Sequence, residues 1–224
     1  MLSKGFNKCG DMQYLMAEKA MKGEPFDMEV KIDGERILAH IKKSKSTENL
    51  NEFRLFTRNS SDYSDIYSIL GSEILRSIKY DIDCIIDGEV AAWDSEFHEK
   101  LPFGSNQTVA RGEIEYNQLL LEKRDDNSNS ALTKWLKFTA FDIVYINGPK
   151  SSDIISRNIS CRNKFIISDS SYPPTPGDIT NLPLIIRQAI LEEIIEPFKD
   201  RYLFIYTLNF NIFYSNTKFI NYKS

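Results

Sequence analysis

The sequence lacks the features that mark several specialised classes of protein. It has only three cysteines, which are widely separated and form no Cys-x-x-Cys pair: Cys9, Cys84 and Cys161. This pattern excludes a disulfide framework and a zinc site of the usual spacing, and it favours reduced thiols in a cytosolic or nuclear protein. No apolar run approaches the roughly 20 residues of a membrane span, and the first residues contain no signal-peptide apolar region. The sequence therefore predicts a soluble intracellular protein that does not bind a membrane.

An excess of positive charge is also lacking. The 28 Lys and Arg residues are outnumbered by 32 Asp and Glu residues, which gives a formal net charge of -4. Non-specific affinity for nucleic acid comes from clustered Lys and Arg, so the overall charge of this chain would not hold DNA. With 42% hydrophobic and 12% aromatic residues among 224, the composition is that of a folded globular protein of one or two domains.

Strand-like and helix-like patterns are interspersed along the chain. Alternation or short apolar runs predict strands in five segments: 26–31, 35–42, 53–57, 83–93 and 134–147. Helical spacing of apolar residues predicts helices at 10–23, at 63–78 and after Pro183. The charged stretch 111–130 is expected to be a surface loop, and the proline-rich stretch 172–178 a connector. Together these elements predict an α+β fold with a mostly antiparallel sheet and flanking helices.

Charge and glycine interrupt the strand pattern at three places, which is typical of a functional site carried by a sheet. In the first, EVKIDGER at 29–36, strand alternation puts Lys31 and Asp33 on one face, and Gly34 permits a sharp turn or a close approach of the backbone. A lysine nucleophile must lose its proton, which desolvation or nearby cations favour. Asp33 would orient this amine or accept its proton. Taken alone, the segment also fits a hairpin turn with Asp-Gly at its corner.

The other two places lie in apolar strands. The segment IIDGEV at 85–90 carries Glu89, whose carboxylate is costly to bury unless it is paired, hydrogen-bonded or bound to a cation. In FTAFDIVYI at 138–146, strand alternation puts Phe138 and Asp142 on one face and Phe141 on the other, and an aromatic ring there is a platform for a nucleobase. The structural alternatives are a second turn for the acidic segment and core positions for the aromatic residues.

The order of these segments resembles that of the motifs of ATP-dependent DNA ligases, members of the covalent nucleotidyltransferase superfamily. KIDGER at 31–36 is similar to their KxDGxR nucleotide-attachment motif, and three later motifs follow in the family's order: FTRN at 56–59, IDGE at 86–89 and AFDI at 140–143. Finer features, such as LPFG at 101–104 and LPL at 182–184, resemble fungal, yeast-type DNA ligase IV, the ligase of non-homologous end joining. The resemblance extends from about residue 26 to residue 198. It implies a nucleotidyltransferase (ATP-grasp-like) adenylation domain.

The resemblance implies a role for each motif residue. Lys31 would attack the α-phosphate of ATP and form a lysyl-AMP phosphoramidate, with Asp33 orienting the amine. Five further residues would bind the nucleotide: Glu29, Arg36, Arg58, Glu89 and Phe141. The two arginines would contact phosphate, ribose or the DNA end, Phe141 would stack on adenine, and Glu89 would hold the ribose or position Mg2+. The implied partner is nicked or broken double-stranded DNA in the nucleus, whose 5′-phosphate would receive the AMP before sealing.

The resemblance is incomplete. After the helix that follows Leu-Pro-Leu, the family pattern has a Glu-Gly pair and a later Lys-x-Lys motif; the sequence contains no Glu-Gly pair, and neither Lys218 nor Lys223 lies in such a motif. Nor does the sequence contain the family's DNA-encircling domain, its oligonucleotide-binding domain or the repeats that bind the end-joining partner protein. We therefore expect a helical lead-in at 1–25 and a partial adenylation domain at 26–202, truncated before the last motifs and weakly active or inactive.

Alternatives are open for both the function and the last segment. The function could instead be that of a non-catalytic nucleotide-binding remnant or gene-model fragment, or of an RNA ligase or mRNA-capping nucleotidyltransferase, although Arg36 and its flanks favour a DNA ligase. The segment 203–224 is rich in Phe, Ile, Tyr, Asn and Lys. It is either translated non-coding or frame-shifted sequence, or a strand-rich edge encoded by an A/T-rich genome.

Overall fold

The computed structural model describes residues 32–44, 51–122, 132–162, 175–196 and 203–205. All of them lie in one compact unit, Lys31–Thr207. The second unit, Met1–Val30 with Leu208–Ser224, lies outside the described residues, and so do the expected helix at 10–23 and the expected strand at 26–31. In the described part of the chain, every helix is too short or too polar to cross a membrane.

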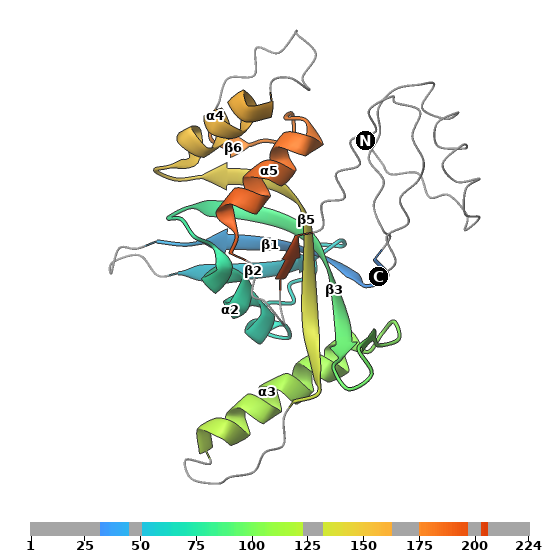
Figure 1. Cartoon of the computed structure of the whole chain (residues 1–224). Helices are drawn as coiled ribbons and strands as arrows, with labels where there is room; N and C mark the ends of the chain where they lie inside the picture. Colours follow the sequence, from blue (N-terminus) through green and yellow to red (C-terminus); the bar gives the residue numbers. More distant parts are fainter. Residues whose placement is uncertain (1–31, 45–50, 123–131, 163–174, 197–202, 206–224) are drawn as a thin grey trace, which may run out of the picture. The chain divides into compact units, whose positions relative to one another are not determined.

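One seven-stranded sheet is the centre of this unit (Figure 1). Its main path is β2-β1-β3-β5-β6, while β4 pairs with β3 and β7 pairs with β5. The pairs are antiparallel apart from β5 with β7, which is parallel. The strands are β1 (Glu35–Lys42), β2 (Glu52–Thr57), β3 (Asp83–Asp94), β4 (Glu99–Lys100), β5 (Lys134–Asn147), β6 (Gly177–Asp178) and β7 (Leu203–Ile205). The prediction of an α+β fold with a mostly antiparallel sheet is confirmed.

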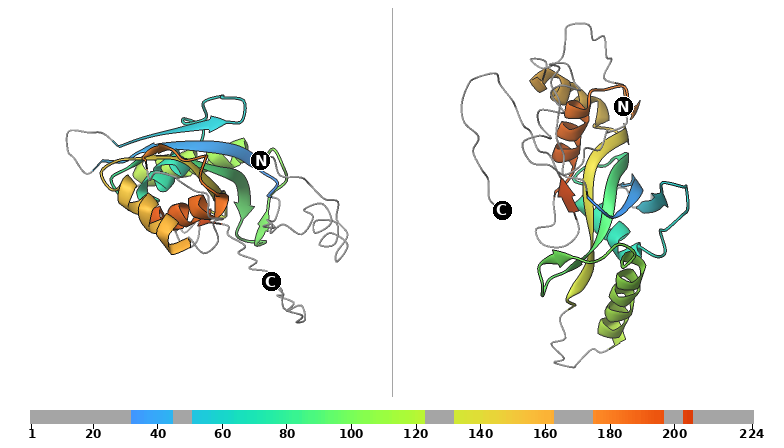
Figure 2. Two further views of the ribbon diagram at one scale, coloured as in Figure 1. Left: turned by 90° about the horizontal axis from the view of Figure 1, so that it is seen from above. Right: turned by 90° about the vertical axis from the view of Figure 1, so that its right-hand side faces the viewer.

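Helices pack against the sheet at several places. Those in the described residues are α2 (Ser68–Ser77), α3 (Asn106–Glu122), α4 (Ser151–Arg162) and α5 (Leu184–Ile194). Helix α2 contacts β1 and β2, α3 contacts β3 and β5, and α5 contacts β5 on one side and α4 on the other. Figure 2 shows α4 and α5 side by side, with β2 at the opposite edge of the sheet. Pro183 immediately precedes α5, as the sequence predicts, because its restricted φ suits the start of a helix.

The strands expected at 35–42, 53–57, 83–93 and 134–147 are confirmed, with ends that shift by one residue at most. In β1, Ile37, Ala39 and Ile41 are buried and alternate with more exposed residues, which is the pattern that reveals a half-buried strand. Strand β3 continues through its Asp-Gly-Glu step because Gly88 makes room for the neighbouring strand. A Cβ on Gly88 would lie 2.4 Å from the ring of Phe138, so the close pairing of β3 with β5 requires glycine there.

Three of the helices differ from the expectation. The surface loop expected at 111–130 is wrong up to residue 122, because α3 extends that far. Its buried stripe is narrow, with Asn106, Val109, Ala110 and Glu113, and two of these four are polar, which hides the helical pattern. The helix expected at 63–78 begins only at Ser68, after a turn at 64–67. Helix α4 was not predicted, because serines and other polar residues separate its isoleucines and hide the helical spacing of apolar residues.

The pairing of β3 with β5 contains a β-bulge at Phe141. Ala140 pairs with Gly88, whereas Asp142 pairs with Asp87, so Phe141 is an extra residue that has no counterpart on β3. Such a bulge bends the strand and reverses the alternation of its side chains beyond that point. A second irregularity follows closer to the end of β5.

The bulge corrects one expectation about β5. Asp142 lies opposite Asp87, on the face that Asp87 shares with Glu89, whereas Phe138 lies opposite Val90 and is fully buried in the core. The prediction that Phe138 and Asp142 share a face is therefore wrong. Strict alternation fails here because it takes no account of the inserted residue.

The side chain of Asn106 fills a gap in the hydrogen bonding of β3. The pairing of β1 with β3 starts at Glu35, opposite Val90, and β4 pairs with β3 only from Trp93. Between these two ladders, Asn106 Oδ1 accepts a hydrogen bond from the Ala92 N–H at 2.8 Å, and Asn106 Nδ2 donates to the Val90 carbonyl at 3.0 Å. The amide thus replaces a strand residue and fixes the start of α3 to the sheet.

We expect Asn106→Ala to lower the free energy of unfolding by about 1–3 kcal/mol, because buried backbone groups at Ala92 and Val90 lose their partners. Urea titration measures this change. Asn117→Ala is the matched control, since Asn117 is exposed on the same helix and its replacement should change the free energy by less than about 0.5 kcal/mol. If the two variants are equally stable, the side chain of Asn106 does not replace the missing strand residue.

Candidate active site

The register of the sheet brings the four sequence motifs together on adjacent strands. The strand order β2-β1-β3-β5 places the FTRN, KIDGER, IDGE and AFDI segments next to one another. Arg36 in β1 lies opposite Glu89 in β3. Arg58 is exposed just after β2, whose last residue pairs with the residue that follows Arg36. Phe141, which is partly buried, is the extra residue of β5 opposite the Asp87–Gly88 step.

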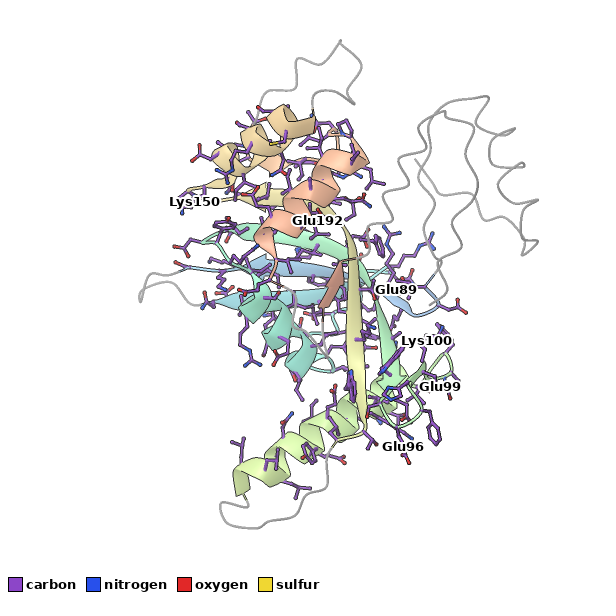
Figure 3. The ribbon with its side chains drawn as sticks, in the orientation of Figure 1. Glu89, Glu96, Glu99, Lys100, Lys150 and Glu192 are labelled. Carbon is purple, nitrogen blue, oxygen red and sulfur yellow. The ribbon has the colours of Figure 1, made fainter. Side chains whose placement is uncertain are left out.

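Two side chains hold the backbone of the KIDG segment from neighbouring strands. Glu89 Oε1 on β3 accepts a hydrogen bond from the Gly34 N–H at 3.1 Å, and Lys100 Nζ on β4 donates to the Asp33 carbonyl at 2.7 Å. Figure 3 shows Glu89 and Lys100 on the same side of the molecule. The segment next to Lys31 is therefore fixed by a carboxylate and an ammonium group that come from later parts of the chain.

Gly34 is needed for this approach. A Cβ at this position would lie 2.3 Å from the carbonyl oxygen of Val90, which is closer than any side chain permits. Asp33 itself is exposed. Lys31 and Glu29 lie outside the described residues, so their roles as nucleophile and nucleotide-binding residue stay predictions, as does the orienting role of Asp33.

Arg36 is held by a double interaction with Asp87. Arg36 Nε donates to Asp87 Oδ1 at 2.9 Å, and Arg36 Nη2 donates to Asp87 Oδ2, which forms a parallel pair of charge-assisted hydrogen bonds. This interaction raises the pKa of the Arg36 guanidinium, against the opposing effect of partial burial. The Asp87 side chain is 5% exposed and that of Arg36 is 48% exposed, so half of the arginine still faces solvent.

The acid that is buried in the IDGE segment is therefore Asp87. The sequence predicted that Glu89 is the carboxylate that is costly to bury. Glu89 is only partly buried, and it accepts a hydrogen bond from the Gly34 N–H. Asp87 compensates for its burial through Arg36, as a buried carboxylate must. The roles expected for Arg36, Arg58, Glu89 and Phe141 toward a nucleotide stay predictions.

A second arginine pairs with the neighbouring acid on β5. Arg187 in α5 donates from Nε to Asp142 Oδ1 and from Nη2 to Asp142 Oδ2, both at 2.8 Å. Each of these side chains is 15% exposed. Because Asp142 lies directly opposite Asp87, the site contains two adjacent carboxylates, each neutralised by its own guanidinium group.

Tyr67 fixes the start of β1 from the other side. Its hydroxyl donates to Glu35 Oε2 at 2.5 Å, and the Tyr67 side chain is almost completely buried. Burial, followed by the hydrogen bond to Glu35, raises the pKa of Tyr67 far above its usual range, so this phenol stays a donor at any physiological pH. The residue after Gly34 in the KIDGER segment is thus anchored as well.

Sequence reasoning missed the residues that position the motifs: Asp87, Lys100, Arg187 and Tyr67. Arg187 had one recognisable signal, because it stands in an otherwise apolar helix segment, LIIRQAIL at 184–191, where a charged side chain needs a partner. Asp87 was quoted within its motif, but nothing in the sequence separated its role from that of Glu89. Lys100 and Tyr67 carry no signal of their own.

The resemblance implies a magnesium ion that accompanies ATP. The described residues contain no group of three or more His, Cys, Asp or Glu side chains that could hold a metal by themselves. Mg2+ is commonly bound by one or two carboxylates together with substrate phosphates and water, and Glu89 fits that arrangement. Its role as a magnesium ligand stays a prediction.

An α+β domain that carries a Lys-x-Asp-Gly segment beside IDGE and AFDI strands has the features of a nucleotide-transferring enzyme domain. A family model described as "ATP dependent DNA ligase domain" matches residues 1–222. The chain therefore belongs to the ATP-dependent DNA ligase domain family, and the resemblance read from the order of the motifs is confirmed.

The chain is also similar to curated proteins named DNA ligase 4. It is 29% identical to that of Yarrowia lipolytica over 179 residues, which cover 75% of this chain and 17% of the relative. It is 28% identical to that of Arabidopsis thaliana over 159 residues, 71% of this chain and 11% of the relative. It is 33% identical to that of Aspergillus oryzae over 132 residues, 55% of this chain and 12% of the relative. The chain thus spans less than a fifth of the length of these relatives.

Among solved structures, the chain is similar to the crystal structure of the ligase domain from M. tuberculosis LigD. The sequences are 21% identical, the TM-score is 0.31, and the match covers 54% of this chain and 30% of the other.

We expect Asp87→Asn to lower the free energy of unfolding by about 1–2 kcal/mol, because an amide cannot accept both charge-assisted hydrogen bonds of Arg36. The loss stays below that of a fully buried pair, since water can solvate the exposed half of Arg36. Thermal or urea unfolding measures it. Asp83→Asn, at the partly exposed start of the same strand, is the control, and an equal effect of both substitutions would contradict a special role for Asp87.

Proposed function

We propose that this domain adenylates its own Lys31 with ATP, the first step of DNA ligation. The observation that carries the proposal is the convergence of KIDGER, FTRN, IDGE and AFDI on four adjacent strands, with the backbone beside Lys31 held by Glu89 and Lys100. Membership of the ATP-dependent DNA ligase domain family supports it.

In this reaction the Lys31 amine would give up a proton to Asp33 or to solvent water and attack the α-phosphorus of ATP. A nitrogen–phosphorus bond forms, the bond between the α-phosphorus and the bridging oxygen breaks, and pyrophosphate leaves with that oxygen. The cationic group of Lys100 is attached to the same segment through the Asp33 carbonyl, and a nearby cation favours the neutral amine that the attack requires. Asp33 would orient the amine.

The other motif residues would bind the nucleotide. The exposed half of the Arg36 side chain and the exposed Arg58 offer guanidinium groups to phosphate or ribose. Phe141, released from the strand ladder by the bulge, would stack on adenine. Glu89 and Glu29 would contact the ribose or a bound cation. A magnesium ion, when bound with ATP, would neutralise phosphate charge and help pyrophosphate to leave.

The later steps would transfer AMP to the 5′-phosphate of a broken or nicked DNA strand, and a 3′-hydroxyl would then displace it. The similarity to proteins named DNA ligase 4 supports a place in non-homologous end joining in the nucleus. The domain boundaries at residues 25 and 202 belong to the same proposal, whereas the end-joining partner protein would bind only through the C-terminal repeats of the full-length family.

We expect weak, substoichiometric labelling when the chain is incubated with α-labelled ATP and Mg2+. The 224 residues contain no Glu-Gly pair, and no Lys-x-Lys motif follows α5; each missing stabilising group costs on the order of 100- to 1,000-fold in rate. The label should be covalent, acid-labile and absent from Lys31→Arg. Lys150→Arg, at an exposed lysine outside the motifs, is the matched control.

Three outcomes would contradict the proposal. Label that persists in Lys31→Arg would assign the nucleophile elsewhere. Label from GTP in preference to ATP would favour an mRNA-capping nucleotidyltransferase, and the absence of label from both at high enzyme concentration would favour a non-catalytic nucleotide-binding protein.

A further inference from the structure

Helix α5 holds the bulged part of β5 through one nearly buried arginine. Arg187 binds both carboxylate oxygens of Asp142 at 2.8 Å, and each side chain is 15% exposed. Its remaining nitrogen, Nη1, donates to the carbonyl of Thr180 at 3.3 Å and to that of Leu182. Every nitrogen of the guanidinium group is therefore used, and the planar fork joins β5 to the segment that leads into α5.

The next residue of α5 contacts the bulge itself. Gln188 Nε2 lies 3.4 Å from the carbonyl oxygen of Phe141. Consecutive residues of the helix thus contact consecutive residues of the strand, one through the backbone of Phe141 and one through the side chain of Asp142. This arrangement fixes both the position and the direction of the strand where it bulges.

The strand ladders do not supply this restraint. Phe141 has no counterpart on β3, because its neighbours pair with Gly88 and Asp87. On the other side of β5, the parallel pairing with β7 extends as far as Ala140 within the described residues. A bulged residue outside a regular ladder keeps conformational freedom unless another element fixes it, and in the described part of the chain α5 contacts it.

We propose that Arg187 is a positioning residue for the nucleotide site. By clamping Asp142, it fixes the bulge and so directs Phe141 toward the base of the bound nucleotide. The inference rests on the proposed function, in which Phe141 stacks on adenine. Lysine cannot replace arginine here, because a single ammonium group cannot form the paired hydrogen bonds to Asp142 and also reach the two carbonyls.

The clamp also differs from the other arginine–carboxylate pair of α5. Arg157 of α4 pairs with Glu193 of α5, and the Arg157 side chain is 56% exposed. That pair links two helices and, in the described part of the chain, forms no hydrogen bond or ion pair with β5. Arg157→Lys therefore alters the packing of α5 without touching the bulge, which makes it the matched control for Arg187→Lys.

The first experiment tests the clamp in the protein without nucleotide. Hydrogen–deuterium exchange followed by mass spectrometry is measured on peptides that cover residues 138–147. We expect Arg187→Lys and Asp142→Asn to accelerate exchange there at least tenfold, while Arg157→Lys leaves it at the wild-type rate. Wild-type exchange in both clamp variants would overturn the proposal, whatever the protein binds.

The second experiment separates positioning from general stability. Titration calorimetry compares the dissociation constants of ATP and of ribose 5-triphosphate, which has the phosphates and sugar but no base. We expect Arg187→Lys to weaken ATP binding about 10- to 100-fold, as misplacement of a stacking group does, and to leave the analogue without the base unchanged. Phe141→Ala should have the same effect, and the double variant should lose no more than Phe141→Ala alone.

A structural role alone would weaken both ligands equally, and that result would overturn the proposal. Equal binding of the two ligands by the wild-type protein would contradict adenine stacking, and hence the proposed function. The hydrogen–deuterium exchange data would still show whether Arg187 fixes the bulge. If Arg187→Lys does not fold, Gln188→Ala provides a comparable test, because it removes the contact with the Phe141 carbonyl.

Discussion

Two carboxylates lie side by side on neighbouring strands, and the sheet can form only if both of their charges are neutralised. Asp87 and Asp142 face each other across β3 and β5, where like charges repel and where burial makes each charge costlier. The structure resolves the conflict with two guanidinium forks, Arg36 from β1 and Arg187 from α5. Each guanidinium group forms parallel hydrogen bonds with one carboxylate. The four side chains therefore form a row of charges in which the two anions, Asp87 and Asp142, lie between the two cations, Arg36 and Arg187. β1, β3, β5 and α5 must all be in place before all four of these charges are satisfied, so the row couples the docking of α5 to the assembly of the sheet.

The bulge at Phe141 is what makes this row possible. If Phe141 paired regularly and formed no bulge, strict alternation would turn Asp142 toward the face of Phe138, which is fully buried among apolar side chains. The extra residue moves Asp142 to the face of Asp87 and Glu89, and leaves the core face to Phe138, which packs where Gly88 has no side chain. A single irregularity in strand pairing thus keeps an apolar face apolar and a polar face polar. It also frees Phe141 from the ladder, in the same row as the motif residues of the other strands.

The sequence predicted those parts of the molecule that depend on local pattern. Strands β1, β2, β3 and β5, Pro183 at the start of α5 and the four motifs were recognised because alternation, proline geometry and motif order are local signals. Strands β4 and β6 are too short to show alternation, and the connector expected at 172–178 ends in β6. Helix α3 was mistaken for a loop beyond residue 111 because, of its four buried residues, Asn106, Val109, Ala110 and Glu113, only the charged Glu113 lies in that stretch. The partners of the charged residues were out of reach for another reason. Arg36 and Asp87 are 51 residues apart, and Asp142 and Arg187 are 45 apart, so the pairing depends on a strand order and a bulge that sequence spacing does not encode.

Most of the residues that position the motifs lie outside them. The backbone of the first motif is held by Lys100 from β4, and Glu35 of the same motif by Tyr67, while the fourth motif is held by Arg187 and Gln188 from α5. None of these four lies in a motif. Since each acts through one or two directional hydrogen bonds, a substitution at any of them can displace a motif whose own sequence is intact. The presence of all four motifs is thus a necessary condition for the site, and its geometry is set by the contacts that surround them.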